Sequence, residues 1–188
     1  MINKIIIVGG GTAGWMTAAT LSKFFSNKEI VLIESPNIPT VGVGESTLGQ
    51  INQWLSMMQI KECDATYKLS IRFQDFGRLG DGGFHYPFGD PYTDGNVSEL
   101  NDWYFKKFLY PHTHNMDYAE CVYPQMALIA NNKLTDKTDL LPGNWSSKAD
   151  SAYHFDATKF GIWLRDKVCI PQGVKHIKEE IETVEADF

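Results

Sequence analysis

The chain has 188 residues, of which 43% are hydrophobic and 21% charged, with a formal net charge of −6. This composition predicts a soluble globular protein, and the negative charge argues against nucleic acid or an anionic membrane as its main partner. No secretory leader or membrane-spanning run is visible, and the three cysteines are widely spaced, so we expect a cytoplasmic protein with reduced thiols.

The most informative pattern lies between residues 5 and 34. A β-branched run at 5–8 predicts a strand, and a glycine turn at 9–14 follows it directly. An apolar-periodic stretch then predicts a helix ending near Phe25, and residues 30–33 predict a second strand. This order of strand, glycine turn, helix and strand is typical of a dinucleotide-binding unit.

Each position of the glycine turn has a separate expected role. Gly9 allows a tight turn, Gly11 lets the backbone approach a pyrophosphate, and Gly14 lets the helix pack closely on the sheet. Thr12 and Ala13 stand at the start of the helix, where free N–H groups and the positive end of the helix dipole attract phosphates. The turn therefore predicts a phosphate site.

Glu34 follows the second predicted strand, about 20 residues after Gly14. A carboxylate at this place accepts hydrogen bonds from a ribose hydroxyl. The same carboxylate repels a 2′-phosphate, so Glu34 argues against NADP and leaves NAD and FAD open.

The rest of the chain predicts fewer regular elements. A proline-containing loop at 35–39 leads into a second glycine-bearing segment at 40–47. We then expect a helix at 48–58, a strand at 67–73, an elaborated loop at 74–95, a helix at 99–109, an irregular connection at 131–151, a helix at 157–168 with Asp156 as N-cap, and a strand at 174–177.

The predicted fold is an α/β, Rossmann-like FAD/NAD(P)-binding fold with three layers and a mostly parallel sheet. Residues 1–188 are expected to form a single FAD-binding region with an aromatic-rich insertion on the substrate side at 74–151. Only about three βα-type units are recognisable, so we expect an incomplete sheet and the first part of a longer architecture.

Several segments resemble the flavin-dependent halogenases of the tryptophan halogenase type. They occur in family order at residues 5–16, 39–47, 62–73, 117–119 and 153–157. The resemblance implies that reduced FAD, dioxygen and a halide ion give hypohalous acid, which halogenates an electron-rich, indole-like substrate. It also implies a separate flavin reductase as partner, since no NAD(P)H site is recognisable.

The lysine of the family maps onto Lys68. The resemblance implies that Lys68 hydrogen-bonds the hypohalous acid or forms a haloamine with it. A buried ammonium can polarise such an oxidant, and a desolvated amine could be halogenated. From spacing alone, Lys68 would be a solvated lysine on a half-exposed strand.

The resemblance also assigns a strap along the isoalloxazine ring to Gly42, Val43, Gly44 and Glu45. Glycines in such a strap let backbone lie against a flat ring. Without the resemblance, the same residues predict a bend after the second strand.

Tyr86 and Phe88 are the candidate substrate contacts. The related tryptophan halogenases hold the indole with a His-x-Phe-Gly segment, and Phe88-Gly89 aligns with its end. In this alignment Tyr86 stands where the histidine would be, which puts tryptophan in doubt as the substrate. Shifting the alignment by one residue places His85 at the histidine position but no longer aligns Phe88. A packed aromatic loop is the alternative interpretation.

The Trp-x-Trp-x-Ile-Pro motif that marks halogenases is absent from the chain. A related FAD monooxygenase or reductase and a non-catalytic nucleotide-binding fragment therefore stay open, as does a companion chain carrying the missing half. His112 and His114 lack further ligands at suitable spacing, so we expect no metal site.

Overall fold

The computed structural model describes residues 2–40, 45–60, 65–91, 99–113, 116–134 and 151–185. The chain divides into two compact units. Unit 1 consists of Met1–Ser46, Gln53–Thr66 and His154–Phe188, and unit 2 consists of Thr47–Asn52 and Tyr67–Tyr153.

Unit 1 contains a parallel sheet. Its strands are β1 (Lys4–Val8), β2 (Glu29–Glu34) and β8 (Lys175–Lys178), in the order β1-β2-β8. Both pairs are parallel, so Ile7 faces Leu32 and Leu32 faces His176 across the sheet. The parallel α/β arrangement predicted from the first 34 residues is confirmed.

Helix α1 (Thr12–Phe24) connects β1 to β2 and supplies much of the core. Its small residues Ala18 and Ala19 are fully buried, which allows close packing. Helix α6 (Ala157–Trp163) and the π-helical segment η1 (Leu164–Cys169) pack against α1. Leu32 of β2 is likewise fully buried.

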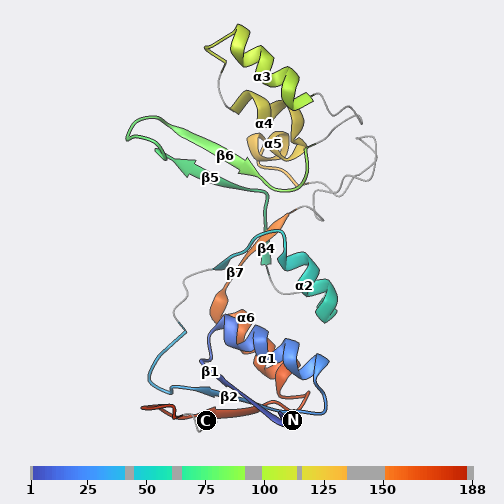
Figure 1. The fold of residues 1–188 in the computed structure, drawn as a ribbon, viewed down its shortest axis with the longest axis vertical. Coiled ribbons are helices and arrows are strands. Elements are labelled where there is room, and N and C mark those ends of the chain that lie inside the picture. The colour runs from blue at the N-terminus through green and yellow to red at the C-terminus, as the bar shows by residue number, and fades with distance from the viewer. Residues whose placement is uncertain are drawn as a thin grey trace. The chain divides into compact units, whose positions relative to one another are not determined.

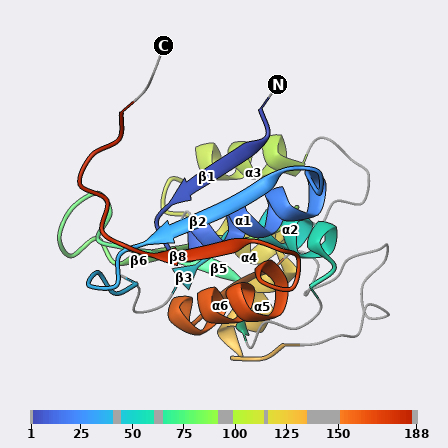
Figure 2. The ribbon, with the colours of Figure 1, turned by 90° about the horizontal axis from the view of Figure 1, so that it is seen from below.

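These helices cover one face of the sheet, as Figures 1 and 2 show from two directions. On the helix-free face, Ile6 and Val8 of β1 are 53% and 61% exposed. Within the described ranges, the second helical layer of the predicted three-layer arrangement is not found.

The helix predicted at 157–168 has two parts, because the α-helix ends at Trp163 and a π-helical segment continues to Cys169. Its predicted start is confirmed, since the Asp156 carboxylate accepts a hydrogen bond from the amide of Lys159 at 2.9 Å.

A second sheet has the strand order β3-β7-β4. These strands are β3 (Glu45–Ser46), β7 (Ala152–Phe155) and β4 (Ala65–Lys68), and β3 pairs with β7 in antiparallel fashion. Strand β7 was not predicted. Helix α2 (Ile51–Met58) lies inside the predicted range 48–58.

Unit 2 contains a hairpin of β5 (Ser70–Gln74) and β6 (Gly83–Pro87). The loop prediction for 74–95 is therefore wrong over 83–87, where Phe84 stacks on Phe73 of β5 with ring centroids 5.1 Å apart. The strand predicted at 67–73 is divided at Leu69 between β4 and β5.

Three helices complete the described part of unit 2. Helix α3 (Glu99–Leu109) has the predicted bounds, whereas α4 (Met116–Val122) and α5 (Pro124–Ala130) were not predicted. Most of the predicted connection at 131–151 lies outside the described residues. Among the helices described, none is long and apolar enough to cross a membrane.

Gly14 offers a test of the packing between the glycine turn and α1. A Cβ added there would lie 1.9 Å from the Gly9 carbonyl oxygen, so Gly14→Ala should lower the free energy of unfolding by about 2 kcal/mol or more. The control is Gly161→Ala, whose Cβ would meet only Trp15 Cδ1 at 3.6 Å and should stabilise α6 by about 0.5 kcal/mol. Urea denaturation of both variants measures the difference, and equal stabilities would contradict the packing argument.

Cys169 offers a test of core burial. Burial raises the pKa of its thiol to about 12, and its Sγ lies 3.6 Å from the Trp15 carbonyl oxygen. Because the thiolate is the reactive form, Cys169 should resist iodoacetamide at pH 8 until the chain unfolds, whereas the exposed Cys121 should react at once. Peptide mass mapping after timed labelling checks this, and similar rates at the two sites would contradict it.

Candidate functional site

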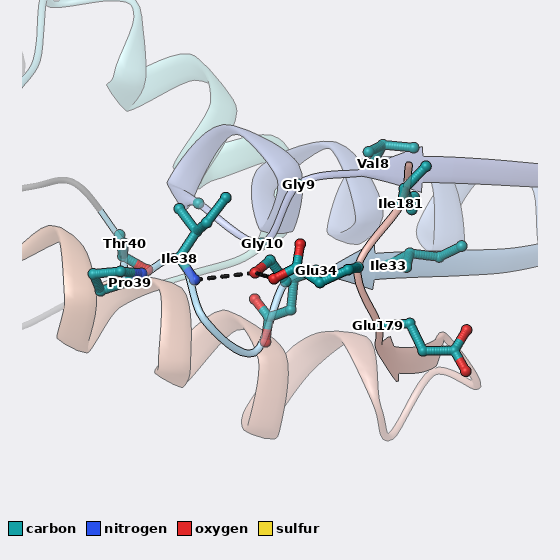
Figure 3. A pocket seen from close by; sticks show the side chains of 13 residues that line it. Val8, Gly9, Gly10, Ile33, Glu34, Ile38, Pro39, Thr40, Glu179 and Ile181 are labelled. Carbon is teal, nitrogen blue, oxygen red and sulfur yellow. Dashed lines mark hydrogen bonds between the residues drawn. The ribbon is translucent and has the colours of Figure 1, made fainter. Parts of the chain in front are cut away.

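A pocket of about 360 Å³ lies in unit 1 where β1 and β2 end. Figure 3 shows it from close by. Glycine backbone forms one part of its lining, and apolar and acidic side chains form the rest; the lining residues are Val8, Gly9, Gly10, Gly11, Ile33, Glu34, Ser35, Ile38, Pro39, Thr40, Glu179, Glu180 and Ile181. The carboxyl ends of parallel strands are the usual place for a ligand in such sheets.

The glycine turn has the conformation that its sequence requires. Gly9 has a φ of +114°, which only glycine adopts readily, and its amide donates a hydrogen bond to the Ile33 carbonyl at 2.8 Å. A Cβ on Gly11, by contrast, would meet nothing within 4 Å. The backbone at Gly11 is therefore open to an approaching group.

Helix α1 begins at Thr12, directly after Gly11. The N-cap Gly11 offers no side-chain hydrogen bond and the first turn has no acidic residue, so its N–H groups and positive dipole end favour an anion. Thr12 itself is buried and donates from Oγ1 to the Ala157 carbonyl at 3.4 Å, whereas Ala13 is exposed.

Glu34 lies at the other side of the glycine turn, beside Gly10 in Figure 3. Its Oε1 is 2.7 Å from Nε2 of His176 in β8. A Cβ on Gly10 would lie 1.4 Å from Glu34 Oε2, so the carboxylate occupies the space above this glycine. Sequence reasoning missed both Gly10 and His176, because neither follows from the G-x-G-x-x-G spacing.

At the rim of the pocket, hydrogen bonds connect the loop after β2 to the segment that follows β8. Ser35 Oγ accepts hydrogen bonds from the amides of Asn37 and Ile38 at 2.9 and 3.0 Å, and donates to Glu180 Oε1. Glu180 Oε1 also accepts from Asn37 Nδ2 at 3.0 Å. The loop thereby joins the segment that follows β8, and Glu34, Glu179 and Glu180 make this part of the pocket acidic.

The proposed flavin strap is described only at its end. Gly42, Val43 and Gly44 lie outside the described residues, and Glu45 is the first residue of β3, where it pairs with Phe155. Their predicted contact with a flavin stays a prediction.

Lys68 ends β4, in unit 2. Its Nζ donates a hydrogen bond to the Thr47 carbonyl at 3.2 Å and lies 5.2 Å from the centroid of the Phe88 ring. Burial lowers the pKa of the Lys68 ammonium. This environment differs from that of a fully solvated surface lysine.

Of the two candidate substrate residues, Tyr86 is 61% exposed and Phe88 only 6%. Phe88 donates its amide hydrogen bond to the Leu69 carbonyl at 2.9 Å, which fixes its ring near Lys68. His85, the alternative to Tyr86, has its Nδ1 2.8 Å from Ser70 Oγ, and burial and the charge of Arg72 lower its pKa.

His112 belongs to the described residues and His114 does not. Within the described ranges, no group of three or more His, Cys, Asp or Glu side chains is arranged to hold a metal ion.

Comparison with known proteins gives one family. The tryptophan halogenase family model matches residues 4–188. The chain is 30% identical to the tryptophan 6-halogenase ThaL of Streptomyces albogriseolus over 99% of its own length. It also matches the apo structure of VirX1 with a TM-score of 0.86 and 41% identity, and the flavin-dependent halogenase Xcc4156 of Xanthomonas campestris with a TM-score of 0.80 and 28% identity; each match covers 100% of this chain.

The match extends over only part of each relative. It spans 38% of ThaL and 37% of both the VirX1 and the Xcc4156 chains. The parallel sheet and its glycine turn agree with the family model, which matches residues 4–188. This chain therefore belongs to the tryptophan halogenase family.

Proposed function

We propose that this chain is the FAD-binding portion of a halogenase that uses reduced FAD, dioxygen and halide to halogenate an electron-rich, indole-like substrate. The observation that carries the proposal is the pocket of unit 1, in which an open glycine turn, a helix N-terminus and Glu34 lie together in a chain of this family. A separate flavin reductase would supply the reduced flavin.

The residues of the pocket fit a dinucleotide. The open space at Gly11 would admit a pyrophosphate, and Thr12 and Ala13 begin the helix whose N–H groups would bind it. Glu34 would accept the hydrogen bond of the adenosine ribose. Three acidic side chains line the pocket and would repel a 2′-phosphate, which favours FAD over NADP.

When bound, the reduced flavin would supply the electrons that convert dioxygen and halide into hypohalous acid. Gly42, Val43, Gly44 and Glu45 would lie along its isoalloxazine ring. The chain's own task is to hold the dinucleotide at the glycine turn and to keep the backbone close to it.

Lys68 is the proposed catalytic residue. One N–H of its ammonium is used by the Thr47 carbonyl, which leaves two donors for the hypohalous acid. Hydrogen bonding from Nζ would polarise the oxidant and direct its halogen toward the substrate. A lowered pKa makes the Nζ proton easier to donate as the oxidant reacts.

Tyr86 and Phe88 would contribute differently to the substrate site. Tyr86 presents an exposed ring that an aromatic substrate could stack on. Phe88 is buried, so we propose that it supports the Lys68 ammonium through a cation–π contact and offers the substrate only an edge.

Substitution of Gly11 tests FAD binding. Gly11→Asp should abolish it, because the carboxylate would stand in the pyrophosphate space and repel it. Gly11 is the N-cap of α1 and its Cβ would meet nothing, so Asp and Asn should both be tolerated by the fold. Titration of FAD by fluorescence measures affinity, and Gly11→Asn, which adds size without charge, should bind more tightly than Gly11→Asp. Unchanged affinity in Gly11→Asp would refute the assignment.

Substitution of Lys68 tests catalysis in an active preparation that contains this chain, supplied with halide and a flavin reductase. Lys68→Ala should reduce halogenated product at least about a hundredfold while flavin oxidation continues. The control is Lys107→Ala, which removes another lysine that lies over an aromatic ring, Trp103, at 5.3 Å. Retained halogenation in Lys68→Ala, measured by chromatography of the product, would exclude Lys68 from the mechanism.

A further inference from the structure

We propose that His176 is a positioning residue for nucleotide recognition: it holds the Glu34 carboxylate in the orientation that accepts an adenosine ribose. The inference rests on the proposed function, because it assumes that the pocket of unit 1 binds an adenine dinucleotide. It adds to that function a residue that lies outside the glycine turn and outside the lining of the pocket.

The sheet brings His176 and Glu34 to the same face. His176 is the register partner of Leu32, and Glu34 is two residues beyond Leu32 on β2, so both side chains leave the sheet on the side of α1. The distance from His176 Nε2 to Glu34 Oε1 is 2.7 Å, and the two side chains are only 14% and 20% exposed. Because a carboxylate oxygen only accepts, Nε2 is the donor in this hydrogen bond.

The imidazole is itself held in place. The buried Trp15 of α1 contacts His176 edge to face, with ring centroids 5.0 Å apart and an interplanar angle of 77°. This contact restricts rotation of the His176 ring. The direction of its Nε2–H bond is therefore set by the packing of α1 on β8.

The other oxygen of Glu34 remains available. Oε2 lies over Gly10, and among the described residues no donor bonds to it. Because Gly10 has no Cβ, Oε2 can occupy this position on the pocket side. His176 therefore fixes one carboxylate oxygen while the second faces the pocket, as a ribose hydroxyl requires.

Arg165 does not replace His176 as the partner of Glu34. Arg165 lies close enough for the charge of Glu34 to help raise its pKa, but Asp166 is the main cause. Its guanidinium bonds both oxygens of Asp166, from Nε to Oδ1 at 2.7 Å and from Nη2 to Oδ2 at 3.0 Å. His176 is thus the direct hydrogen-bond partner of Glu34, and Arg165 contributes only a more distant charge.

Orienting Glu34 in advance would lower the entropy cost of binding a ribose hydroxyl. The matched variants are His176→Gln and His176→Asn. Glutamine places an amide nitrogen where His176 has Nε2, whereas asparagine reaches only the position of Nδ1. Both substitutions introduce an uncharged carboxamide, and they differ by one methylene, so the comparison tests the position of the donor.

The experiment compares ADP with 2′,3′-dideoxy-ADP, which lacks both ribose hydroxyls, by isothermal titration of the whole chain. The unmodified chain should bind ADP about tenfold more tightly than the dideoxy analogue. His176→Gln should keep most of this ratio, and His176→Asn should bring it close to one while affinity for the dideoxy analogue stays unchanged. A purely structural role would lower both affinities together and leave the ratio intact.

Lys175→Met is the control on the same strand. Lys175 pairs with Glu29 at 2.9 Å on the opposite side of β8 from His176, so its loss should leave the ratio unaltered. A measurement without any variant follows the His176 imidazole by NMR: its signals should move when ADP binds and move less with the dideoxy analogue.

The outcomes separate this inference from the proposed function. If the unmodified chain binds neither FAD nor ADP, the proposed function fails and the inference fails with it. If it binds both but does not distinguish ADP from the dideoxy analogue, or if the Gln and Asn variants give the same ratio, only the inference about His176 is overturned.

Discussion

The hydrogen bond from the Gly9 amide to the Ile33 carbonyl, 2.8 Å long, is the interaction on which the pocket of unit 1 depends. It joins the end of β1 to the end of β2 at the point where the chain turns into α1. Glu34 is the next residue after Ile33, so this bond places the carboxylate beside the glycine turn. One backbone contact therefore sets the separation between the glycine turn, the proposed phosphate site, and Glu34, the proposed ribose site.

The close packing of α1 against the glycine turn also helps to position Glu34. Gly14 sits against the Gly9 carbonyl, and the helix carries Trp15 onto the face of the sheet where His176 stands. His176 in turn contacts Glu34. The glycine turn, α1 and β8 together position the Glu34 carboxylate, although β8 lies near the other end of the sequence.

The sequence predicts those parts of this arrangement that depend on residues close together in the chain. The run of strand, glycine turn, helix and strand uses residues within about one βα unit of each other, and the Asp156 cap needs only its own helix. His176 could not be found this way, because it meets Glu34 across 142 residues and only the pairing of β8 with β2 reveals the contact.

Two features of unit 2 do not follow from the sequence. Strand β6 is five residues long and follows a glycine- and aspartate-rich turn, so its alternation was hidden in a segment whose composition predicts a loop. The contact between Lys68 and Phe88 joins the end of β4 to the residue after β6. Sequence similarity could name Lys68 as a candidate, but the buried ring beneath its ammonium depends on tertiary packing.

The helix-free face of the sheet has a consequence for the chain in solution. Ile6 and Val8 expose apolar side chains on β1, which is also an edge strand: among the described residues, no strand pairs with its outer backbone groups in the order β1-β2-β8. An apolar face next to an open edge favours association between copies, by burial of side chains and by pairing of backbones. Association through this face would weaken on cooling, because the attraction between apolar surfaces does.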